Sequence, residues 1–348
     1  MLENTERTEL NTLGEFGLIK HLTQFIEIKN ESTIKGIGDD SAVIDYKGKQ
    51  TVISTDMLVE GVHFDLAYVP LKHLGFKAVS VNLSDIYAMN ATPKQITVSF
   101  AISNRFSVEA MEELYAGMMM ACKKHNVDIV GGDTTTAKSG LVISITAIGE
   151  ANADDLVYRN GAKEGDLLCV TGDLGAAYVG LQLLEREKQI YLESPGVQPD
   201  LGGNDYILER QLKPEARIDI PVLLKKLDVK PTSMIDISDG LASEILHICT
   251  QSSVGCNLFE EKIPIDPSTY NMAREFNMDP TICALNGGED YELLFTIDQS
   301  DFPKIKANPD ISVIGHMTRN SDGVNLITKG GTSHTLTAQG WDSMKRDV

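Results

Sequence analysis

Aspartates at predicted turns are the side chains of this sequence best suited to chemistry. In residues 234–241, a short strand runs into a Ser-Asp-Gly turn, and a helical pattern follows. Asp236 ends the strand and Asp239 opens the helix. An aspartate there can cap the helix, whose first N–H groups favour oxygen acceptors, or can bind a hard cation such as Mg²⁺. For Asp239 taken alone, capping is the more common use.

The same arrangement recurs along the chain. Further aspartates lie at predicted element ends or on one helix face, beside small or hydroxyl side chains: Asp40, Asp56, Asp85 and Asp133. So many carboxylates in one site would not stay ionised without cations to offset their repulsion. Glycoside or peptide hydrolysis is the alternative, but it needs only two acids of unlike pKa. Phosphoryl transfer with several Mg²⁺ ions fits better, and the fork-shaped cation Arg159 would suit a phosphate.

These residues also have structural interpretations. Ser54, Thr55 and Asp56 are consecutive oxygen donors where a predicted strand ends, and an ordinary turn explains them equally well. Asp85 lies three residues after Asn82, so the two share a neighbouring helical face. Such a polar pair beside an apolar stripe is about as often solvated surface as a site.

A glycine-rich stretch at 36–42 contains Asp39 and Asp40. It lacks the third glycine of a dinucleotide fingerprint and the Lys-Ser/Thr of a P-loop, so it is weak evidence for a nucleotide site by itself. As a turn that brings backbone and carboxylate close to a ligand it is plausible. Of the two aspartates, Asp40 is the expected ligand. His63, further along, is more often a hydrogen-bonded structural residue than a functional one.

Composition narrows the class of partner. The formal charge of −19 argues against nucleic acid or an anionic membrane as the main partner. The sequence shows no signal-peptide pattern and no apolar run long enough to span a membrane. Five scattered cysteines without a CxxC pattern are typical of reduced thiols in a cytoplasmic protein.

Strand and helix patterns alternate, which predicts an α/β or α+β fold. A polar segment of small residues at 150–155 marks the boundary between two domains, 1–150 and 151–348. Residues 192–204, with prolines and glycines, are expected to form an irregular loop. Helices are predicted at 14–29, 73–90, 107–124 with Ser107 as N-cap, up to about 187, up to about 227 and at 241–250; strands are predicted at 51–55, 94–103, 127–130, 141–149, 167–171 and 293–297.

Motifs in a fixed order carry a family resemblance. They are Gly-Ile-Gly-Asp-Asp at 36–40, Ser-Thr-Asp-Met-Leu-Val-Glu-Gly-Val-His-Phe at 54–64, Ala-Val-Ser-Val-Asn-Leu-Ser-Asp at 78–85, Gly-Gly-Asp-Thr-Thr at 131–135, Ile-Asp-Ile-Ser-Asp-Gly-Leu at 235–241 and Gly-Gly-Glu-Asp-Tyr-Glu-Leu at 287–293. Together they resemble the thiamine-monophosphate kinases, relatives of aminoimidazole ribonucleotide synthetase and selenophosphate synthetase. The resemblance covers about residues 14–341. Single motifs are shared across that superfamily, whereas the ordered set is specific to the kinases.

The resemblance implies a fold and an activity. The fold would be the two-domain fold of aminoimidazole ribonucleotide synthetase, with mixed β-sheets and packed helices. The reaction would be ATP- and Mg²⁺-dependent phosphorylation of thiamine monophosphate to thiamine diphosphate, in thiamine diphosphate biosynthesis. The protein would be a homodimer. Its N-terminal domain would carry the dimer interface and most Mg²⁺ and ATP aspartates, and its C-terminal domain would complete the ATP and substrate site.

The resemblance also implies roles for individual residues. Several Mg²⁺ ions would be held by Asp40, Ser54, Thr55, Asp56, Asp85, Asp133, Asp236 and Asp239. ATP would contact Gly132, Asp133, Arg159 and Ser238, and the thiamine substrate would contact His63, Glu289 and Trp341. After Trp341 the chain departs from the family pattern, since only the aromatic residue and the following acid are kept.

The implied chemistry needs no general base. The nucleophile is a phosphate oxygen, mostly ionised at neutral pH because the second pKa of a phosphomonoester is about 6. The protein must align two phosphates that repel each other and screen their charge. A sister activity of the same superfamily and a non-catalytic nucleotide- or metal-binding protein are the alternatives. The first cysteine, Cys122, lies far from the N-terminus, which counts against a selenophosphate synthetase.

Overall fold

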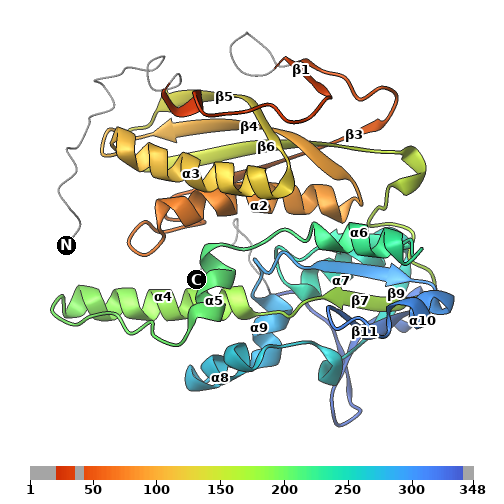
Figure 1. Ribbon diagram of the computed structural model, residues 1–348. Helices are drawn as coiled ribbons and strands as arrows, with labels where there is room; N and C mark the ends of the chain where they lie inside the picture. Colours follow the sequence, from red (N-terminus) through yellow and green to blue (C-terminus); the bar gives the residue numbers. More distant parts are fainter. Residues whose placement is uncertain (1–20, 36–42, 340–348) are drawn as a thin grey trace. The chain divides into compact units, whose positions relative to one another are not determined.

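The computed structural model describes residues 21–35 and 43–339 (Figure 1). These residues form two compact units. The N-terminal unit holds the described residues up to Ile86 together with Ala91–Asp154, and the C-terminal unit holds Tyr87–Asn90 and the described residues from Asp155 onward. Each unit contains a mixed β-sheet with packed helices. The predicted α/β class is therefore confirmed.

The N-terminal unit is built on a four-stranded sheet of order β3-β6-β4-β5. Only β4 and β5 run parallel; the other neighbours are antiparallel. A two-stranded sheet, β1 with β2, lies earlier in the chain. The bounds are β1 Thr33–Lys35, β2 Val43–Ile44, β3 Gln50–Val59, α2 Leu71–Ala88, β4 Thr92–Ile102, α3 Val108–His125, β5 Asp128–Thr136 and β6 Leu141–Ala151, with a 3₁₀ turn at Ala153–Asp155.

Helices α2 and α3 lie on the same side of this sheet (Figure 1). In β6, alternate residues such as Ile143 and Ile145 are buried, as expected of a strand with one covered face. The helices cross at two glycines. A Cβ on Gly75 would lie 2.0 Å from the Leu114 carbonyl oxygen, and one on Gly117 would lie 1.9 Å from that of Lys72. Only glycine permits so close a crossing.

The C-terminal unit contains a seven-stranded sheet of order β13-β12-β9-β11-β7-β10-β8, in which β12 and β9 are parallel. Its strands are β7 Leu167–Thr171, β8 Ser233–Asp236, β9 Val254–Phe259, β10 Leu293–Ile297, β11 Ile311–Arg319, β12 Val324–Ile327 and β13 Ser333–Thr335. Its helices are α4 Ala176–Glu193, α5 Asp205–Leu212, α6 Asp219–Lys226, α7 Leu241–Ser252, α8 Pro267–Glu275, α9 Pro280–Asn286 and α10 Phe302–Ile305, with 3₁₀ turns at Glu260–Lys262, Gln299–Asp301 and Asn320–Asp322.

Both faces of this sheet are covered. On β7, Leu168 and Val170 pack with α7, whereas Cys169 between them packs with α6. The same alternation puts β10 residues into both clusters. The short strands therefore read as almost continuous apolar runs, which is why β7 and β10 were predicted to the residue. Within the described ranges, no helix combines the length and apolar character that a membrane crossing requires.

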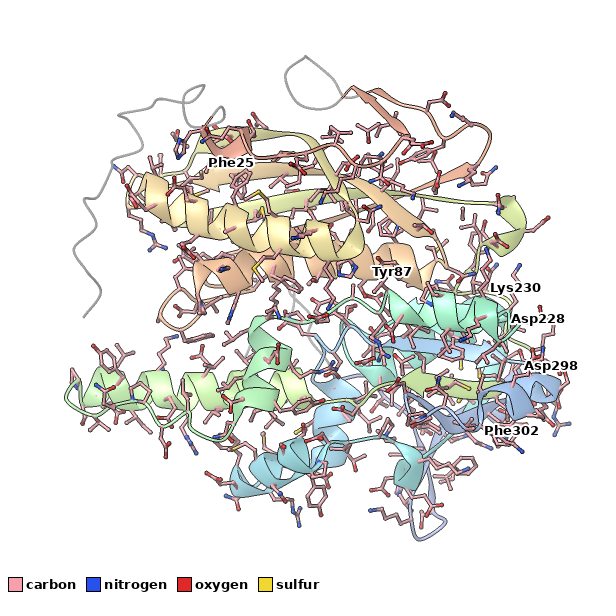
Figure 2. The ribbon with its side chains drawn as sticks, in the orientation of Figure 1. Phe25, Tyr87, Asp228, Lys230, Asp298 and Phe302 are labelled. Carbon is pink, nitrogen blue, oxygen red and sulfur yellow. The ribbon has the colours of Figure 1, made fainter. Side chains whose placement is uncertain are left out.

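The helix predicted over 14–29 is wrong at its C-terminal end. Among its described residues, only 21–23 are helical. Phe25, taken as part of an apolar helix face, has 72% of its surface exposed (Figure 2). The chain leaves the helix because the buried Asp128 carboxylate accepts the backbone N–H groups of Lys29 (2.7 Å) and Asn30 (3.0 Å). A tertiary contact thus overrides the local pattern.

Two strands are longer than predicted. β3 continues to Val59 because it pairs with β6 along its whole length, and β5 continues to Thr136 because it pairs with β4. Asp56 and Asp133 therefore lie inside strands rather than at their ends, which corrects the sequence interpretation. Asp236 does end its strand, as predicted.

Candidate functional site

Three predicted metal ligands of the N-terminal unit lie together. Ser54 and Asp56 are two apart on β3 and so point to one face of the sheet. The Ser54 hydroxyl donates to the Asp85 carboxylate on α2. The Asn82 side-chain oxygen accepts the backbone N–H of Asp56 at 2.9 Å, and the Asn82 amide donates to the Ala78 carbonyl at 2.9 Å. The polar face of α2 is therefore joined to β3 and is not solvated surface.

The electrostatics of this group favour a cation. Burial, together with a smaller repulsion from the neighbouring Asp85 carboxylate, raises the pKa of Asp56 to about 6. A carboxyl group in such a place gains from a positive charge beside it. Carboxylate and hydroxyl oxygens are also the donors that Mg²⁺ prefers. The donor set therefore fits a hard divalent cation.

Thr55 and Asp133 lie on the opposite face of the same sheet. The Thr55 hydroxyl donates to the Ile145 carbonyl at 3.0 Å and accepts the Thr146 hydroxyl at 3.1 Å. Asp133 is exposed on the far edge strand, where it pairs with Ser99. Two strands separate it from β3, so at about 4.8 Å per strand its backbone is roughly 14 Å away. Within this unit, the structure does not bring either side chain to Asp56 and Asp85.

Gly132 allows β5 to approach β4 closely. A Cβ at that position would lie 1.8 Å from the Val98 carbonyl oxygen. The glycine is also exposed, so its backbone can be approached from outside.

His63 has a structural contact. Its ring Nδ1 accepts the backbone N–H of Val59 at 3.0 Å, and the backbone N–H of His63 donates to the Val59 carbonyl at 2.9 Å. The ring therefore closes the turn after β3. Nδ1 must be unprotonated to accept this bond, so in the neutral ring the proton lies on Nε2.

Predicted residues of the C-terminal unit gather on two adjacent turns. Asp236 is buried at the end of β8, and Ser238 and Asp239 follow on the turn into α7. The backbone N–H of Glu289 donates to the Ser238 carbonyl at 2.7 Å. Ser238, Asp239 and Glu289, predicted for ATP, metal and substrate in that order, therefore lie on neighbouring turns.

Asp239 does not cap α7, which corrects the more common reading of that residue. The N-cap is Gly240, with φ 119°. A Cβ there would lie 2.7 Å from the Leu285 carbonyl oxygen, so the turn requires glycine. The backbone N–H of Asp239 instead donates to the Glu244 carboxylate at 3.0 Å.

Glu244 is a carboxylate that sequence reasoning missed. It is 2% exposed, and burial raises its pKa to about 8, with Asp239 and Asp236 adding smaller repulsions. The sequence signal was a glutamate in the first turn of the helix that follows the aspartate motif. Glu244 therefore helps to set the backbone position of Asp239.

Arg159 lies at the other end of α7. Its carbonyl accepts the hydroxyl of Ser252, the last residue of that helix, at 3.3 Å. A helix of 12 residues is about 18 Å long. Within the unit, the Arg159 backbone is therefore not brought to Ser238 and Asp239, which precede the first turn.

Asp40 and Trp341 lie outside the described residues. Across 21–35 and 43–339, no group of three or more His, Cys, Asp or Glu side chains is arranged to hold one metal ion. The carboxylates instead occur as separate small groups, one on β3 and α2 and another beside the start of α7.

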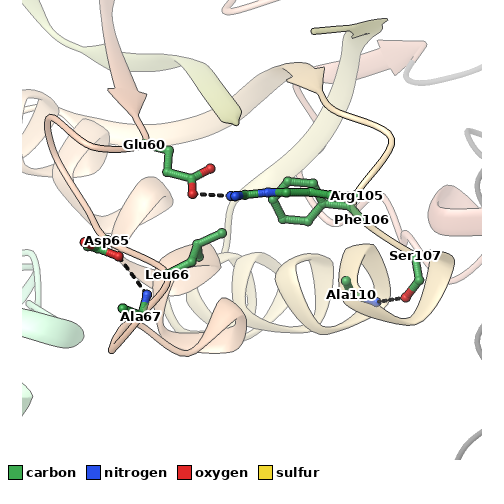
Figure 3. A pocket seen from close by; sticks show the side chains of 8 residues that line it. All are labelled: Glu60, Asp65, Leu66, Ala67, Arg105, Phe106, Ser107 and Ala110. Carbon is green, nitrogen blue, oxygen red and sulfur yellow. Dashed lines mark hydrogen bonds and ion pairs between the residues drawn. The ribbon is translucent and has the colours of Figure 1, made fainter. Parts of the chain in front are cut away.

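A recess of about 480 Å³ opens in the N-terminal unit (Figure 3). The Arg105 side chain crosses the recess and forms an ion pair with Glu60. Its guanidinium carbon lies 4.9 Å from the ring centroid of Phe106. Ser107, the N-cap of α3, forms another part of the wall. None of the predicted site residues lines this recess.

Comparison with known proteins decides the family. The family model described as AIR synthase related protein, N-terminal domain, matches residues 38–151. The chain is 35% identical to the thiamine-monophosphate kinase of Aquifex aeolicus over 328 residues, covering 92% of this chain and 98% of that one. This chain belongs to the thiamine-monophosphate kinase family. The Escherichia coli member of the family is 31% identical over 336 residues, covering 94% and 98% of the two chains.

Solved structures agree with this kinase family. The structure of AaThiL complexed with AMPPCP and TMP is similar with a TM-score of 0.73 at 31% identity, covering 98% of this chain and 100% of that one. The hydrogenase maturation protein HypE in complex with ATP has a TM-score of 0.72 at 20% identity, which shows the shared fold alone. The resemblance drawn from the motifs is confirmed.

Proposed function

We propose that this protein transfers the γ-phosphoryl group of ATP to the phosphate of thiamine monophosphate, giving ADP and thiamine diphosphate. The observation that carries the proposal is 35% identity to a thiamine-monophosphate kinase across 92% of the chain. A similar structure was solved with AMPPCP, an ATP analogue, and TMP. Family membership and the complex of a relative therefore point to the same two substrates.

The acceptor supplies its own nucleophile in this reaction. A phosphomonoester oxygen is largely ionised at neutral pH, so the protein has no proton to remove. The contacts of His63 agree, since one ring nitrogen is occupied by the Val59 N–H. The task of the chain is to hold two anionic groups in line and to exclude competing water.

Magnesium is part of the proposal. The proposed ligands are Asp40, Ser54, Thr55, Asp56, Asp85, Asp133, Asp236 and Asp239. Support comes from the donor set around Asp56, a half-buried residue whose carboxyl group lies near that of Asp85. When bound, Mg²⁺ would neutralise charge on the transferring phosphates. The Ser54 hydroxyl donates to the Asp85 carboxylate, and Asn82 and Glu244 hold the backbone N–H groups of Asp56 and Asp239.

Contacts with the two substrates are also proposed. ATP would contact Gly132, Asp133, Arg159 and Ser238, and thiamine monophosphate would contact His63, Glu289 and Trp341. Thiamine carries a cationic thiazolium ring and an aromatic pyrimidine, so a carboxylate and an indole face are suitable partners. Glu289, fixed beside Ser238, supports this assignment.

We also propose a homodimer formed through the N-terminal unit. Ile53 and Met57 of β3 are 64% and 55% exposed, on the sheet face opposite α2 and α3. Large apolar side chains on an open sheet face commonly mark an interface. As the family resemblance implies, the N-terminal domain would carry most of the aspartates that bind Mg²⁺ and ATP, and the C-terminal domain would complete the ATP and substrate site.

A cytoplasmic location fits the thiols. All five cysteines are free and buried, as is usual where disulfides do not form.

The experiment is a comparison of acceptors. Purified protein is mixed with ATP and Mg²⁺, and thiamine monophosphate, thiamine or aminoimidazole precursors are added in parallel. The proposal expects ADP formation that depends on thiamine monophosphate. ADP formed only with another acceptor would indicate a sister activity, and ATP binding without turnover would indicate a binding protein.

A further inference from the structure

The turn at residues 287–292, here called the glutamate turn, has an unusual backbone. Glu289 and Tyr291 have φ of 58° and 51°, a left-handed conformation that side chains with a Cβ rarely adopt. Their N–H groups donate to the carbonyls of Ser238 and Ile237 at 2.7 and 2.8 Å. Such a backbone persists only where the surroundings hold it, so the neighbours of the turn determine its shape.

Glu292, the last residue of the glutamate turn, is held on both carboxylate oxygens. It is 2% exposed. It accepts the Thr171 hydroxyl at 2.6 Å and the guanidinium groups of Arg210 at 2.8 Å and Arg217 at 2.5 Å. Two arginines therefore meet on one buried carboxylate.

Arg210 connects further pieces of backbone. Its Nη2 donates to the carbonyls of Asp173 (3.1 Å) and Asp290 (3.2 Å). The buried Asp290 carboxylate in turn accepts the N–H of Gly175 at 2.9 and 3.1 Å, just before α4. One guanidinium thus fixes the turn after β7 against the glutamate turn.

The Arg217 side chain is itself oriented by Asp219, which is not part of the glutamate turn. Its Nε and Nη2 donate to the Asp219 carboxylate at 3.0 and 2.8 Å, which leaves Nη1 aimed at Glu292. A buried ion pair contributes little net stability compared with apolar packing. What the arginine fork adds is a defined geometry, because its donors are rigid and planar.

We propose that Arg210 and Arg217 are positioning residues that lock the glutamate turn. The turn carries Glu289 and is hydrogen-bonded to residues 237–238, next to Asp239. The arginines would thereby place the carboxylates that the proposed function assigns to substrate and metal, and in this respect the inference rests on that function. Neither arginine needs to touch a substrate.

The first test is amide hydrogen exchange on the free protein. In Arg217→Gln, exchange of the Glu289 and Tyr291 amides is expected to be roughly tenfold faster, because the turn that carries them is no longer held against the Ser238 and Ile237 carbonyls. Arg217→Lys keeps the charge without the fork and should fall between Arg217→Gln and the wild type. Glu292→Gln provides a second route to the same loosening if Arg217→Gln does not fold.

Arg186→Gln is the matched control. Arg186 lies on α4 in the same unit and pairs with Glu187 and Glu275, with no contact to the glutamate turn. Its loss should leave exchange at Glu289 and Tyr291 within about twofold of the wild type.

The second test is kinetic, at a temperature where circular dichroism shows every variant folded. Arg217→Gln should lower kcat/KM for thiamine monophosphate roughly tenfold, with partial recovery in Arg217→Lys, whereas Arg186→Gln should match the wild type. Unchanged exchange in the glutamate turn would overturn the proposal, and so would faster exchange with unchanged kinetics. A wild-type protein that forms no thiamine diphosphate would instead overturn the proposed function, and the exchange data would still decide whether the arginines hold the turn.

Discussion

At the scale of residues, the carboxylates near β3 and α7 are placed where they repel one another. Asp56 is half-buried beside Asp85, and the pKa of its carboxyl group is raised to about 6. Glu244 is buried near Asp236 and Asp239, with a pKa raised to about 8. Stability alone does not explain such groups, because a neutral isostere would avoid the repulsion. The proposed cation binding would account for them.

Asp56→Asn and Asp239→Asn should therefore separate activity from stability. Each change removes metal-binding charge but keeps the shape of the side chain. Activity is expected to fall on the order of 10²-fold or more, as when an electrostatic group of an active site is removed. The melting temperature of Asp56→Asn without Mg²⁺ should equal or exceed that of the wild type, since repulsion from Asp85 is relieved. Steady-state assays and thermal melts measure the two effects.

Asp228→Asn is the control for these variants. Asp228 is a fully exposed aspartate after α6 (Figure 2), and asparagine tolerates its φ of 54°. Both activity and melting temperature should be unchanged. Wild-type turnover by a folded Asp56→Asn or Asp239→Asn would refute the metal role of that residue.

His125 gives the protein a component of acid sensitivity. It is 3% exposed at the end of α3, and burial, with Lys124, lowers its pKa to about 4. Well above pH 6.5 the His125 ring is neutral in both the folded and the unfolded state. As the pH falls below 6.5, His125 binds a proton in the unfolded state before it does so in the folded state. The free energy of unfolding therefore falls towards pH 4, by up to roughly 3 kcal/mol.

Urea unfolding at pH 7 and pH 4.5 tests this assignment. The loss between the two pH values should be smaller by roughly 2–3 kcal/mol in His125→Gln than in the wild type, because glutamine does not titrate. Equal losses in the two proteins would show that His125 does not carry this part of the acid sensitivity.

At the scale of elements, the crossing of α2 and α3 is a tight constraint on the N-terminal unit. In Gly75→Ala the new Cβ would meet the Leu114 carbonyl oxygen at 2.0 Å, and a backbone atom cannot move aside cheaply. The expected cost is about 3 kcal/mol or more of unfolding free energy. Gly131→Ala is the control, because its Cβ would have only the Thr97 methyl group at 3.9 Å. Equal melting temperatures for the two variants would contradict the crossing geometry.

Elements were predictable where local pattern and tertiary environment agree. β7 and β10 are short, buried on both faces and bounded by turns, and their limits were predicted to the residue. β3 and β5 were predicted too short, since pairing with neighbouring strands extends them. Taken alone, Asp239 was more commonly explained as a helix cap than as a metal ligand, but close packing against Leu285 puts Gly240 at the cap. Strand pairing and backbone packing are long-range effects that a local pattern does not contain.

At the scale of the whole molecule, the open face of the N-terminal sheet predicts self-association. A double variant, Ile53→Asp with Met57→Asp, should convert the proposed dimer to a monomer, because it places charges on the apolar face. Light scattering coupled to gel filtration gives the mass directly. Val222→Asp, at a 67% exposed position of α6, is the control and should stay dimeric. A monomeric wild type, or a dimeric double variant, would contradict the proposed interface.

At this scale, the sequence predicted which types of residue form the candidate site, but it did not predict how they are arranged in space. The ordered motifs pointed to the family, which the comparison with the Aquifex aeolicus protein confirms. The sequence could not show that Thr55 and Asp56 point to opposite faces, because that requires a strand running through both. Nor could it show that Arg210 and Arg217, distant in sequence from the glutamate turn, meet on Glu292.

The most direct test of the account is to follow the phosphorus atoms. Protein, Mg²⁺, ATP and thiamine monophosphate are combined and observed by ³¹P nuclear magnetic resonance. The account predicts that the signal of thiamine monophosphate is replaced by the two coupled signals of thiamine diphosphate, with ADP formed in equal amount and no inorganic phosphate. ADP with inorganic phosphate and unchanged thiamine monophosphate, or no ADP from folded protein, would contradict it.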